Sequence, residues 1–311
     1  MTIIFFGSDE FAAVHLKALI DSRHRVCACV TQPDKARGRG WEVSASPVKQ
    51  RAQEKNIPVL QPADLRAGAF LQQLKACGGD LFVVVAYGRF LPPEVLSLPR
   101  TFVINVHSSL LPEYRGAAPI NWAVINGERE TGLTIMKVTS RMDAGDILAR
   151  EKMEILNDDT AVTLRARMAQ IGPKLLLKTI DSIEKGTYTL TVQNERVATP
   201  APKLIKELGL IRWDRPATTL RNLVRGLLPW PGAYTRYQGK LLKILDADVV
   251  WRDLTSRQPG EVIEVNKEGF IVATRRQGLL VKEVHLEASR PMSAYQFVVG
   301  HKLEVGFKFD N

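Results

Sequence analysis

Cysteine is scarce in this chain, and the few cysteines do not follow the spacing of a disulfide framework or a zinc site. Cys27, Cys29 and Cys77 form an odd set without a C-x-x-C pair. Small disulfide scaffolds and four-ligand zinc centres need paired cysteines. We therefore expect a protein of the reducing cytoplasm and assign these cysteines no role.

Long apolar runs are also missing. No stretch approaches the roughly twenty apolar residues that cross a membrane, and residues 1–7 lack the basic leader and cleavage site of a secretory signal. They are expected to form a first strand instead. No G-x-G-x-x-G follows that strand, which excludes the usual dinucleotide fingerprint. A soluble protein without a membrane partner is expected.

Size and charge limit the remaining choices. A chain of 311 residues with 45% hydrophobic content exceeds the usual single domain and can bury a sizeable core. Lysine and arginine number 43 against 33 acidic residues, which gives a net charge of +10. This excess is consistent with a polyanionic partner such as a nucleic acid.

The first half of the chain alternates apolar runs with helical patterns. Strands are expected near 2–6, 25–31, 58–60, 80–86, 101–106 and 131–138, and a long amphipathic helix over 160–183. This order predicts an α/β fold with a Rossmann-like, mostly parallel open sheet. Ligands of such sheets bind beyond the carboxyl ends of the strands.

The second half has a different texture. The segment 193–208 contains Pro200 and Pro202 and few periodic positions, which is typical of a connector. A helix near 217–227 is followed by short alternating runs, which indicate a small β-barrel. The predicted organisation is a catalytic domain over 1–190, a linker over 191–208 and a C-terminal domain over 209–311.

The stretch 102–147 holds three polar groups where an apolar strand meets a glycine-rich turn. Asn105 and His107 lie two residues apart, so their side chains share a face if the strand continues. Asp143 returns toward the same end of the sheet and could reach His107. An amide, an imidazole and a carboxylate suit acyl transfer, in which an oxygen gains charge while a nucleophile loses a proton.

The same three residues also have an ordinary structural interpretation. Asn105 could cap a turn, His107 could be a satisfied core histidine and Asp143 could be a loop residue. The spacing alone leaves both interpretations open.

A second ambiguous stretch is 31–41, which is expected to be an exposed loop. Its Lys35, Arg37 and Arg39, set among glycines, suit either solvent exposure or contact with phosphate groups.

The exact residues of these stretches favour the catalytic interpretation over the structural one. Short motifs that are spread over nearly the whole chain carry a family resemblance. They lie at 6–12, 105–112, 115–121, 143–146, 203–204, 211–213 and 229–231. They closely resemble the folate-dependent formyltransferases, and within them the branch that formylates initiator methionyl-tRNA. The Asn-x-His and Asp signature is shared by formyltransferases of other acceptors, so it does not by itself fix the acceptor.

The resemblance implies a reaction and its residues. The formyl group of 10-formyltetrahydrofolate would pass to the α-amino group of methionine on initiator tRNA, without a metal. Asn105 and His107 would donate hydrogen bonds to the oxyanion, while Asp143, alone or through His107, would take the ammonium proton. These three positions are the catalytic residues that the resemblance implies.

It also implies binding residues for both substrates. The folate contacts would come from Ser109, Leu110, Leu111 and Pro112 and from Ala86 and Tyr87 in the turn after a buried strand. The apolar pair could equally belong to the core. Lys35, Arg37 and Arg39 would reach the tRNA acceptor end, and the C-terminal barrel would resemble an oligonucleotide-binding fold. A monomer is expected.

Two other functions are compatible with parts of this pattern. An amino-sugar nucleotide could be the acceptor on the same catalytic machinery, but the basic loop and the C-terminal barrel argue against it. A non-catalytic RNA-binding protein could be built on a degenerate enzyme scaffold. The presence of Asn105, His107 and Asp143 together argues against that alternative.

Overall fold

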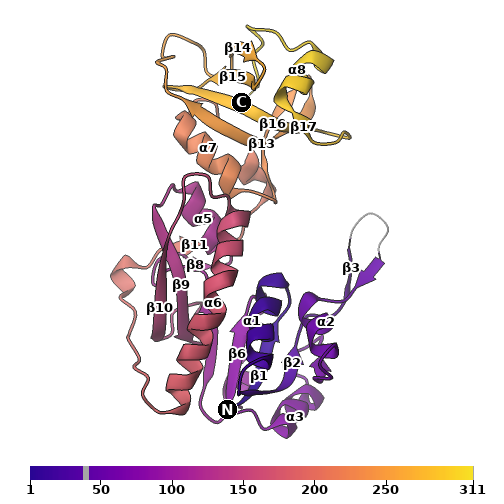
Figure 1. Cartoon of the computed structure of the whole chain (residues 1–311), viewed down its shortest axis with the longest axis vertical. Helices are drawn as coiled ribbons and strands as arrows, with labels where there is room; N and C mark the ends of the chain where they lie inside the picture. Colours follow the sequence, from indigo (N-terminus) through magenta and orange to yellow (C-terminus); the bar gives the residue numbers. More distant parts are fainter. Residues whose placement is uncertain (38–41, 311) are drawn as a thin grey trace. The chain divides into compact units, whose positions relative to one another are not determined.

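The computed structural model describes residues 1–37 and 42–310 and divides the chain into two compact units (Figure 1). Unit 1 comprises 1–119, 130–154 and 165–202, and unit 2 comprises 120–129, 155–164 and 203–311. Neither unit is a continuous piece of the chain. Within the described residues no helix is long and apolar enough to cross a membrane.

Unit 1 is built on a seven-stranded sheet with the order β10-β9-β7-β6-β1-β2-β5. Strands β1, β2, β5, β6 and β7 are parallel, whereas β9 runs antiparallel to β7 and to β10. The bounds are β1 Thr2–Gly7, β2 Arg25–Val30, β5 Val59–Leu60, β6 Leu81–Val85, β7 Val103–His107, β9 Glu130–Lys137 and β10 Ile147–Glu154. The predicted α/β fold with a mostly parallel sheet is confirmed.

The central strands are apolar throughout, as buried parallel strands require. Residues 3–6 of β1 are fully buried, and Phe6 lies in a cluster with Phe82 and Tyr87. Helices of unit 1 are α1 Glu10–Ile20, α2 Pro47–Gln53, α3 Gly68–Cys77, α4 Pro93–Leu96 and α6 Ala161–Glu184. Asp9 caps α1 by accepting from the amide of Ala12 at 3.1 Å.

The sequence predicted the five inner strands and the edge strand β5, and missed the other edge strand, β10. That strand pairs with β9 at the end of the sheet, and its middle residues, from Arg150 to Lys152, are exposed and charged. An edge strand needs only one buried face and gains its hydrogen bonds from its neighbour. Its apolar pattern is therefore weak.

The basic stretch is only partly a loop. Residues Lys35–Arg37 form β3 and pair antiparallel with Glu42–Ser44, β4, in a two-stranded sheet of their own. Figure 1 shows β3 extending away from α2. The prediction of an irregular segment over 31–41 was wrong for these three residues, because the antiparallel partner lies beyond the predicted loop.

Unit 2 contains an antiparallel sheet with the order β12-β13-β16-β15-β14, and β17 pairs with β16. Over the part of the chain that is described, no ladder joins β12 to β14, so the sheet is not a closed barrel. Isolated bridges join Arg236 to Asp310 and Glu261 to Lys308, so the last residues contact both edges. The strands are β12 Ala233–Tyr237, β13 Lys240–Val250, β14 Val262–Asn266, β15 Gly269–Ala273, β16 Gly278–Leu286 and β17 Met292–Ser293.

Two helices complete the core of unit 2. Helix α7, Ala217–Gly226, and helix α8, Ala294–His301, bury Leu220 and Phe297 in the same apolar cluster as Phe270. Helix α5, Pro119–Ile125, begins at the unit boundary, and Asn121 donates to the carbonyl of Gly226 at 2.8 Å.

The predicted linker, 191–208, has little regular secondary structure but forms many hydrogen bonds. It contains the 3₁₀ turns η1 Glu195–Val197 and η2 Lys206–Gly209, and between them β11, Pro200–Ala201. Strand β11 pairs in parallel with β8, Arg115–Gly116. Of the segment predicted as a linker, residues 191–202 thus belong to unit 1 and residues 203–208 to unit 2.

Candidate functional site

Asn105 and His107 lie on β7, between β6 and β9. Asn105 pairs with Val84 and Met136, and His107 pairs with Thr134. Because the strand continues through His107, both side chains leave the same face of the sheet, as predicted. The half-buried carboxamide of Asn105 has no hydrogen-bond partner among the residues described.

The contacts of His107 fix the roles of its two nitrogens. The side chain is only 5% exposed, and Nε2 lies 2.9 Å from the carbonyl oxygen of Tyr114. A carbonyl can only accept, so Nε2 carries the hydrogen and donates it. Nδ1 faces the Oδ2 atom of Asp143 at 3.6 Å. The predicted approach of Asp143 to His107 is therefore present.

Asp143 lies in the loop that joins β9 to β10, and a backbone amide binds its carboxylate. Its φ of 46° lies in the left-handed region, which is costly for a residue with a side chain. The amide of Gly116 donates to Oδ2 at 3.0 Å. No hydrogen bond to Oδ1 occurs within the described part of the chain, so this oxygen can accept a proton from a ligand.

The loop after His107 is tied to β9. The hydroxyl of Thr134 donates to the carbonyl of Ser109 at 2.6 Å and accepts from the amide of Leu111 at 3.1 Å. Leu111 is buried with Met136 and Ile147. Among the predicted folate residues, Leu110 and Pro112 are half-buried, Ser109 is fully buried and Leu111 belongs to the core.

The turn after β6 separates its two predicted folate residues. The Tyr87 ring is 1% exposed and packs edge-on against Phe6 with 5.6 Å between ring centroids. Burial raises the pKa of the Tyr87 phenol. Ala86 is exposed and has a φ of 44°. A ligand at this turn would therefore meet Ala86 rather than the Tyr87 ring.

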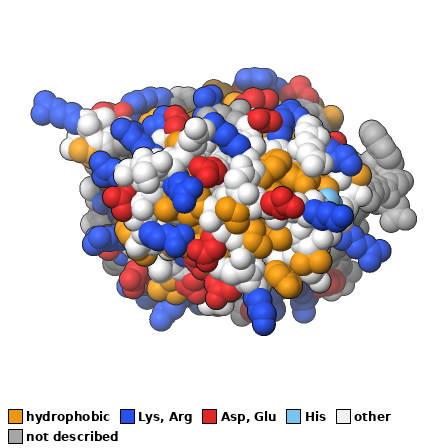
Figure 2. Space-filling view, turned by 90° about the horizontal axis from the view of Figure 1, so that it is seen from above, with side chains coloured by type: hydrophobic (Ala, Val, Ile, Leu, Met, Phe, Trp, Pro, Cys, Tyr) orange, Lys and Arg blue, Asp and Glu red, His pale blue; other side chains and the backbone are white. Residues whose placement is uncertain are grey.

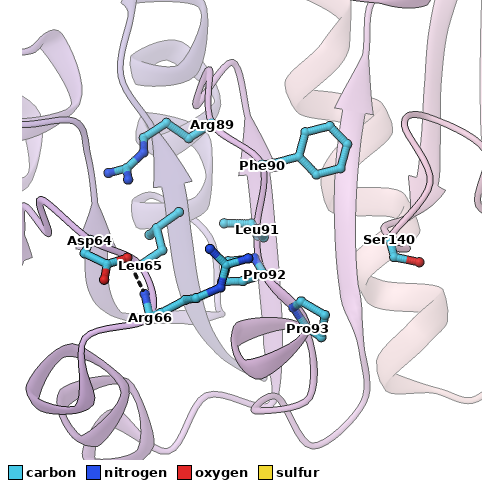
Figure 3. A pocket seen from close by; sticks show the side chains of 9 residues that line it. All are labelled: Asp64, Leu65, Arg66, Arg89, Phe90, Leu91, Pro92, Pro93 and Ser140. Carbon is cyan, nitrogen blue, oxygen red and sulfur yellow. Dashed lines mark hydrogen bonds between the residues drawn. The ribbon is translucent and has the colours of Figure 1, made fainter.

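A hollow of about 220 Å³ opens beside this turn (Figure 3). It lies where the loops after β5, β6 and β9 meet, and Ser140 belongs to the same loop as Asp143. Arg89 donates to the carbonyls of Pro62 and Ala63, both at 2.9 Å. The lining residues are Asp64, Leu65, Arg66, Arg89, Phe90, Leu91, Pro92, Pro93 and Ser140.

Residues 89–92 belong to the turn that the resemblance implied shapes part of the folate pocket, whereas Asp64, Leu65, Arg66 and Ser140 were not predicted. The lining residues come from three separate loops, and only the fold brings them together. Phe90 follows the turn Gly88-Arg89 and is 56% exposed, which only the structure shows.

One group of metal-ligand type occurs in the described structure, away from this site. His24, Asp181 and Glu184 lie within reach of one ion. The same carboxylates are already paired with cations. Arg23 binds both, and the N-terminal amine binds Glu184 at 2.7 Å. This arrangement explains the lowered pKa of both carboxyl groups, which arises first from Arg23 for Asp181 and from the amine for Glu184.

Two of the three predicted tRNA residues lie in β3. Lys35 and Arg37 stand at the ends of β3, opposite Ser44 and Glu42. Arg39 lies outside the described residues.

Unit 2 has a second group of basic residues. Arg212 and Arg215 occupy the turn before α7, and Arg275 and Arg276 the turn between β15 and β16. The amide of Arg275 donates to the carbonyl of Arg215 at 3.3 Å, which brings the turns together. All four are exposed, and none forms an ion pair with another described residue.

The charge on the face drawn in Figure 2 is mixed. Hydrophobic side chains lie there among both basic and acidic ones. This face therefore has no continuous field of one sign.

Comparisons with known proteins cover both halves of the chain. The formyl transferase family model matches residues 1–180, and the model of the formyl transferase C-terminal domain matches residues 203–302. The methionyl-tRNA formyltransferase of Caldanaerobacter subterraneus subsp. tengcongensis is 46% identical and covers 98% of this chain and 99% of its own. That of Desulforamulus reducens is 44% identical over 98% and 96%.

Solved structures share the fold at lower identity. The sugar 3N-formyl transferase WlaRD superposes with a TM-score of 0.68 at 15% identity, over 93% of this chain and 99% of that one. HypX from Aquifex aeolicus, solved with tetrahydrofolic acid, gives 0.63 at 18% identity over 95% of this chain. This chain spans about half of HypX, 46% of its length.

The sequence identity to the methionyl-tRNA formyltransferases distinguishes them from the formyltransferases of other acceptors. It extends through the connector and the C-terminal unit as well as the site. The chain belongs to the methionyl-tRNA formyltransferases of the formyl transferase family.

Proposed function

We propose that the site around His107 transfers a formyl group from 10-formyltetrahydrofolate to the α-amino group of methionine on initiator tRNA. The observation that carries this proposal is the approach of Asp143 to His107 beside the unpaired amide of Asn105. The names of the full-length relatives supply the acceptor.

The formyl oxygen would sit between Asn105 and His107. The attacking amine forms a bond to the formyl carbon, and the carbonyl oxygen gains negative charge. The Asn105 carboxamide can donate to this oxygen without breaking an existing hydrogen bond within the described structure. Nδ1 of His107 is the ring nitrogen left to give the second hydrogen bond, since Nε2 is already bound to Tyr114.

The proton of the new ammonium group would pass to Asp143. Oδ2 already accepts from Gly116, so Oδ1 is the open oxygen. The intermediate then collapses, the bond from the formyl carbon to N10 of the folate breaks, and N10 takes up the proton that Asp143 accepted, which returns Asp143 to its carboxylate form. An α-amino group has a pKa of about 7.7–8.0, so a useful fraction is neutral at pH 7.

The formyl donor would occupy the hollow that leads from Asp64 to Ser140. Its apolar wall, including Phe90 and Leu91, suits a flat heteroaromatic ring, and the exposed Arg66 suits a carboxylate at the rim. Ala86 and the half-buried Leu110 and Pro112 would complete the seat near the formyl group. The side chains of Tyr87 and Leu111 support the pocket from the core.

The tRNA would contact the β3–β4 hairpin and unit 2. Lys35, Arg37 and Arg39 give three cations within five residues of the sequence. A second group of cations is offered by Arg212, Arg215, Arg275 and Arg276. Asp214 lies between the first two in the sequence and lowers the net positive charge of the group. Unpaired arginines on adjoining turns suit phosphate oxygens, which each guanidinium can bind with two hydrogens.

Formylation of charged initiator tRNA with labelled 10-formyltetrahydrofolate tests the proposal. Labelled formyl-methionyl-tRNA is expected, and an amino-sugar nucleotide offered in its place should remain unlabelled. A variant with His107→Ala provides the blank. Labelling of the amino sugar with no labelling of tRNA would replace the acceptor, and binding of tRNA without labelling of either would favour a non-catalytic role.

A further inference from the structure

The connector between the two halves enters the candidate site through one buried side chain, Gln193. It lies in the stretch that the sequence predicts to be a linker, yet its side chain is only 5% exposed. Buried amides in proteins are satisfied by hydrogen bonds, and the partners show what the residue does. Its side chain bonds to the backbone of Asp143 and Gly145 and to the guanidinium of Arg115.

The Gln193 amide nitrogen holds both sides of Asp143. Nε2 donates to the carbonyl of Asp143 at 2.8 Å and to the carbonyl of Gly145 at 2.7 Å. Both of its hydrogens are therefore used on the backbone that flanks one strained residue, whose φ is 46°. A left-handed conformation persists only where surrounding bonds impose it.

The Gln193 oxygen is fixed just as firmly. Oε1 accepts from Nε of Arg115 at 3.0 Å and from Nη2 of Arg115 at 2.8 Å. An arginine has only donors and a carbonyl only accepts, so the carboxamide fits in one orientation alone. Turning it over would place its amino group against the guanidinium and its oxygen against two carbonyls.

These bonds close a ring around the carboxylate. Arg115 is followed by Gly116, whose amide donates to Oδ2 of Asp143 at 3.0 Å. Gln193 thus fixes the backbone of Asp143 on one side and, through Arg115, the segment that binds its carboxylate on the other. We propose that Gln193 is a positioning residue that aims Asp143 at the reacting amine.

The rest of the connector supports the same loop. Thr199 accepts from the amide of Tyr114 through Oγ1 and from the amide of Arg115 through its carbonyl, both at 2.8 Å. The carbonyl of Tyr114 is the group that binds Nε2 of His107. The connector therefore sets the positions of both the histidine and the carboxylate. This inference rests on the proposed function.

Gln193→Glu is the sharpest test, because it keeps the shape and the acceptor and removes both donors. Turnover of methionyl-tRNA formylation should fall about 10- to 100-fold, since a small misplacement of a catalytic group costs that much. The Michaelis constants for tRNA and folate should stay within about threefold, because Gln193 is buried and its hydrogen bonds are all made to the protein. Gln193→Met removes the donors without adding charge and should give a similar loss.

The matched control is Gln72→Glu, the same chemical change on the exposed face of α3. It should leave turnover unchanged. A merely structural role is excluded by repeating both changes in the Asp143→Asn background. There the Gln193 substitution should cost less than about threefold, because the group that it positions no longer accepts a proton.

Three results would overturn the assignment. One is turnover of Gln193→Met within about twofold of the control. Another is a rise in either Michaelis constant with unchanged turnover, which would make Gln193 a binding residue. The third is an equal loss in the Asp143→Asn background. Inactive wild-type protein would instead refute the proposed function, since the control variant would be inactive too.

Discussion

At the scale of single residues, the site contains one group that is free to act and one that is tightly constrained. The Asn105 carboxamide is open, whereas His107 and Asp143 are held by Tyr114 and Gly116. Asn105→Ala and Asp143→Ala should each lower turnover by about 100-fold or more, because each removes a transition-state interaction. Steady-state formylation rates with circular dichroism as a check of folding measure this.

The double variant separates a joint site from independent contributions. Groups that act as one unit lose far less together than the product of the single losses. Losses that multiply fully would show that Asn105 and Asp143 work separately. Near-normal rates in both folded single variants would remove these residues from the chemistry.

His15 gives unit 1 a dependence on pH that is separate from catalysis. It is fully buried on α1, donates through Nδ1 to the carbonyl of Phe11 at 2.8 Å, and Nε2 has no partner among the described residues. Burial lowers its pKa to about 4, partly offset by the bond to Phe11 and by Asp9. Below its ordinary pKa the unfolded chain takes up a proton that the folded chain refuses.

Stability should therefore fall as the pH drops from about 6.5 and level off below about 4. Between pH 7 and pH 5 this one group should cost about 2 kcal/mol of unfolding free energy. Urea unfolding of wild type and His15→Gln across this range checks it. Parallel stability curves for the two proteins would contradict the assignment.

At the scale of elements, the β3–β4 hairpin should act on tRNA rather than on the chemistry. Arg37→Ala with Arg39→Ala should raise the tRNA Michaelis constant and leave the folate constant almost unchanged. Each lost phosphate contact should flatten the salt dependence of tRNA binding by about 0.9 slope unit on a duplex, less on a single strand. Affinity measured at several salt concentrations decides, and unchanged slopes would make the hairpin a solvated element.

The two arginine turns of unit 2 invite a similar comparison with a built-in control. Arg275→Ala with Arg276→Ala removes two exposed, unpaired charges, whereas Arg257 is already paired with Glu261 at 3.5 Å. The first change should weaken tRNA binding several-fold and reduce its salt slope. Arg257→Ala should do less, because its charge is partly neutralised. Equal effects would mean that only net charge matters.

The elements also show what a sequence can predict. Apolar runs such as Val83–Val85 and 103–106 predicted the inner strands, because burial on both faces leaves a strong signal. Asn105, His107 and Asp143 were predicted as neighbours because strand order brings them together. The role of Gln193 gave no local signal, since its partners lie about 50 and 78 residues away. Asp64, Leu65, Arg66 and Ser140 of the hollow were missed for the same reason.

At the scale of the whole molecule, unit 1 ends at Pro202, whereas the predicted catalytic domain ends at residue 190. The two limits predict fragments with different properties. A fragment ending at Leu190 would lose Gln193, Thr199 and β11, whereas one ending at Pro202 keeps them. The amides of Tyr114 and Arg115 donate to Thr199. They should exchange with solvent faster in the shorter fragment than in the longer one.

Hydrogen exchange on both fragments measures this difference. The amides of β1 and β6 serve as an internal reference, because their ladder lies within 1–190 and is common to both. Folate binding should weaken in the shorter fragment to the extent that the loop of Asp143 loosens. Equal protection of Tyr114 in the two fragments would show that the connector is not needed to order the loop.

The paired strands β8 and β11 also set a rule for recombining this enzyme with its relatives. A hybrid whose crossover lies before Gln193 would join the catalytic loop of one parent to the supporting strand of another. The amide of Ala118 donates to Ala201 at 3.2 Å, and a side chain at Gly116 would meet the Ala201 carbonyl at 2.5 Å. Functional hybrids should therefore inherit residues 105–118 and 193–201 from the same parent.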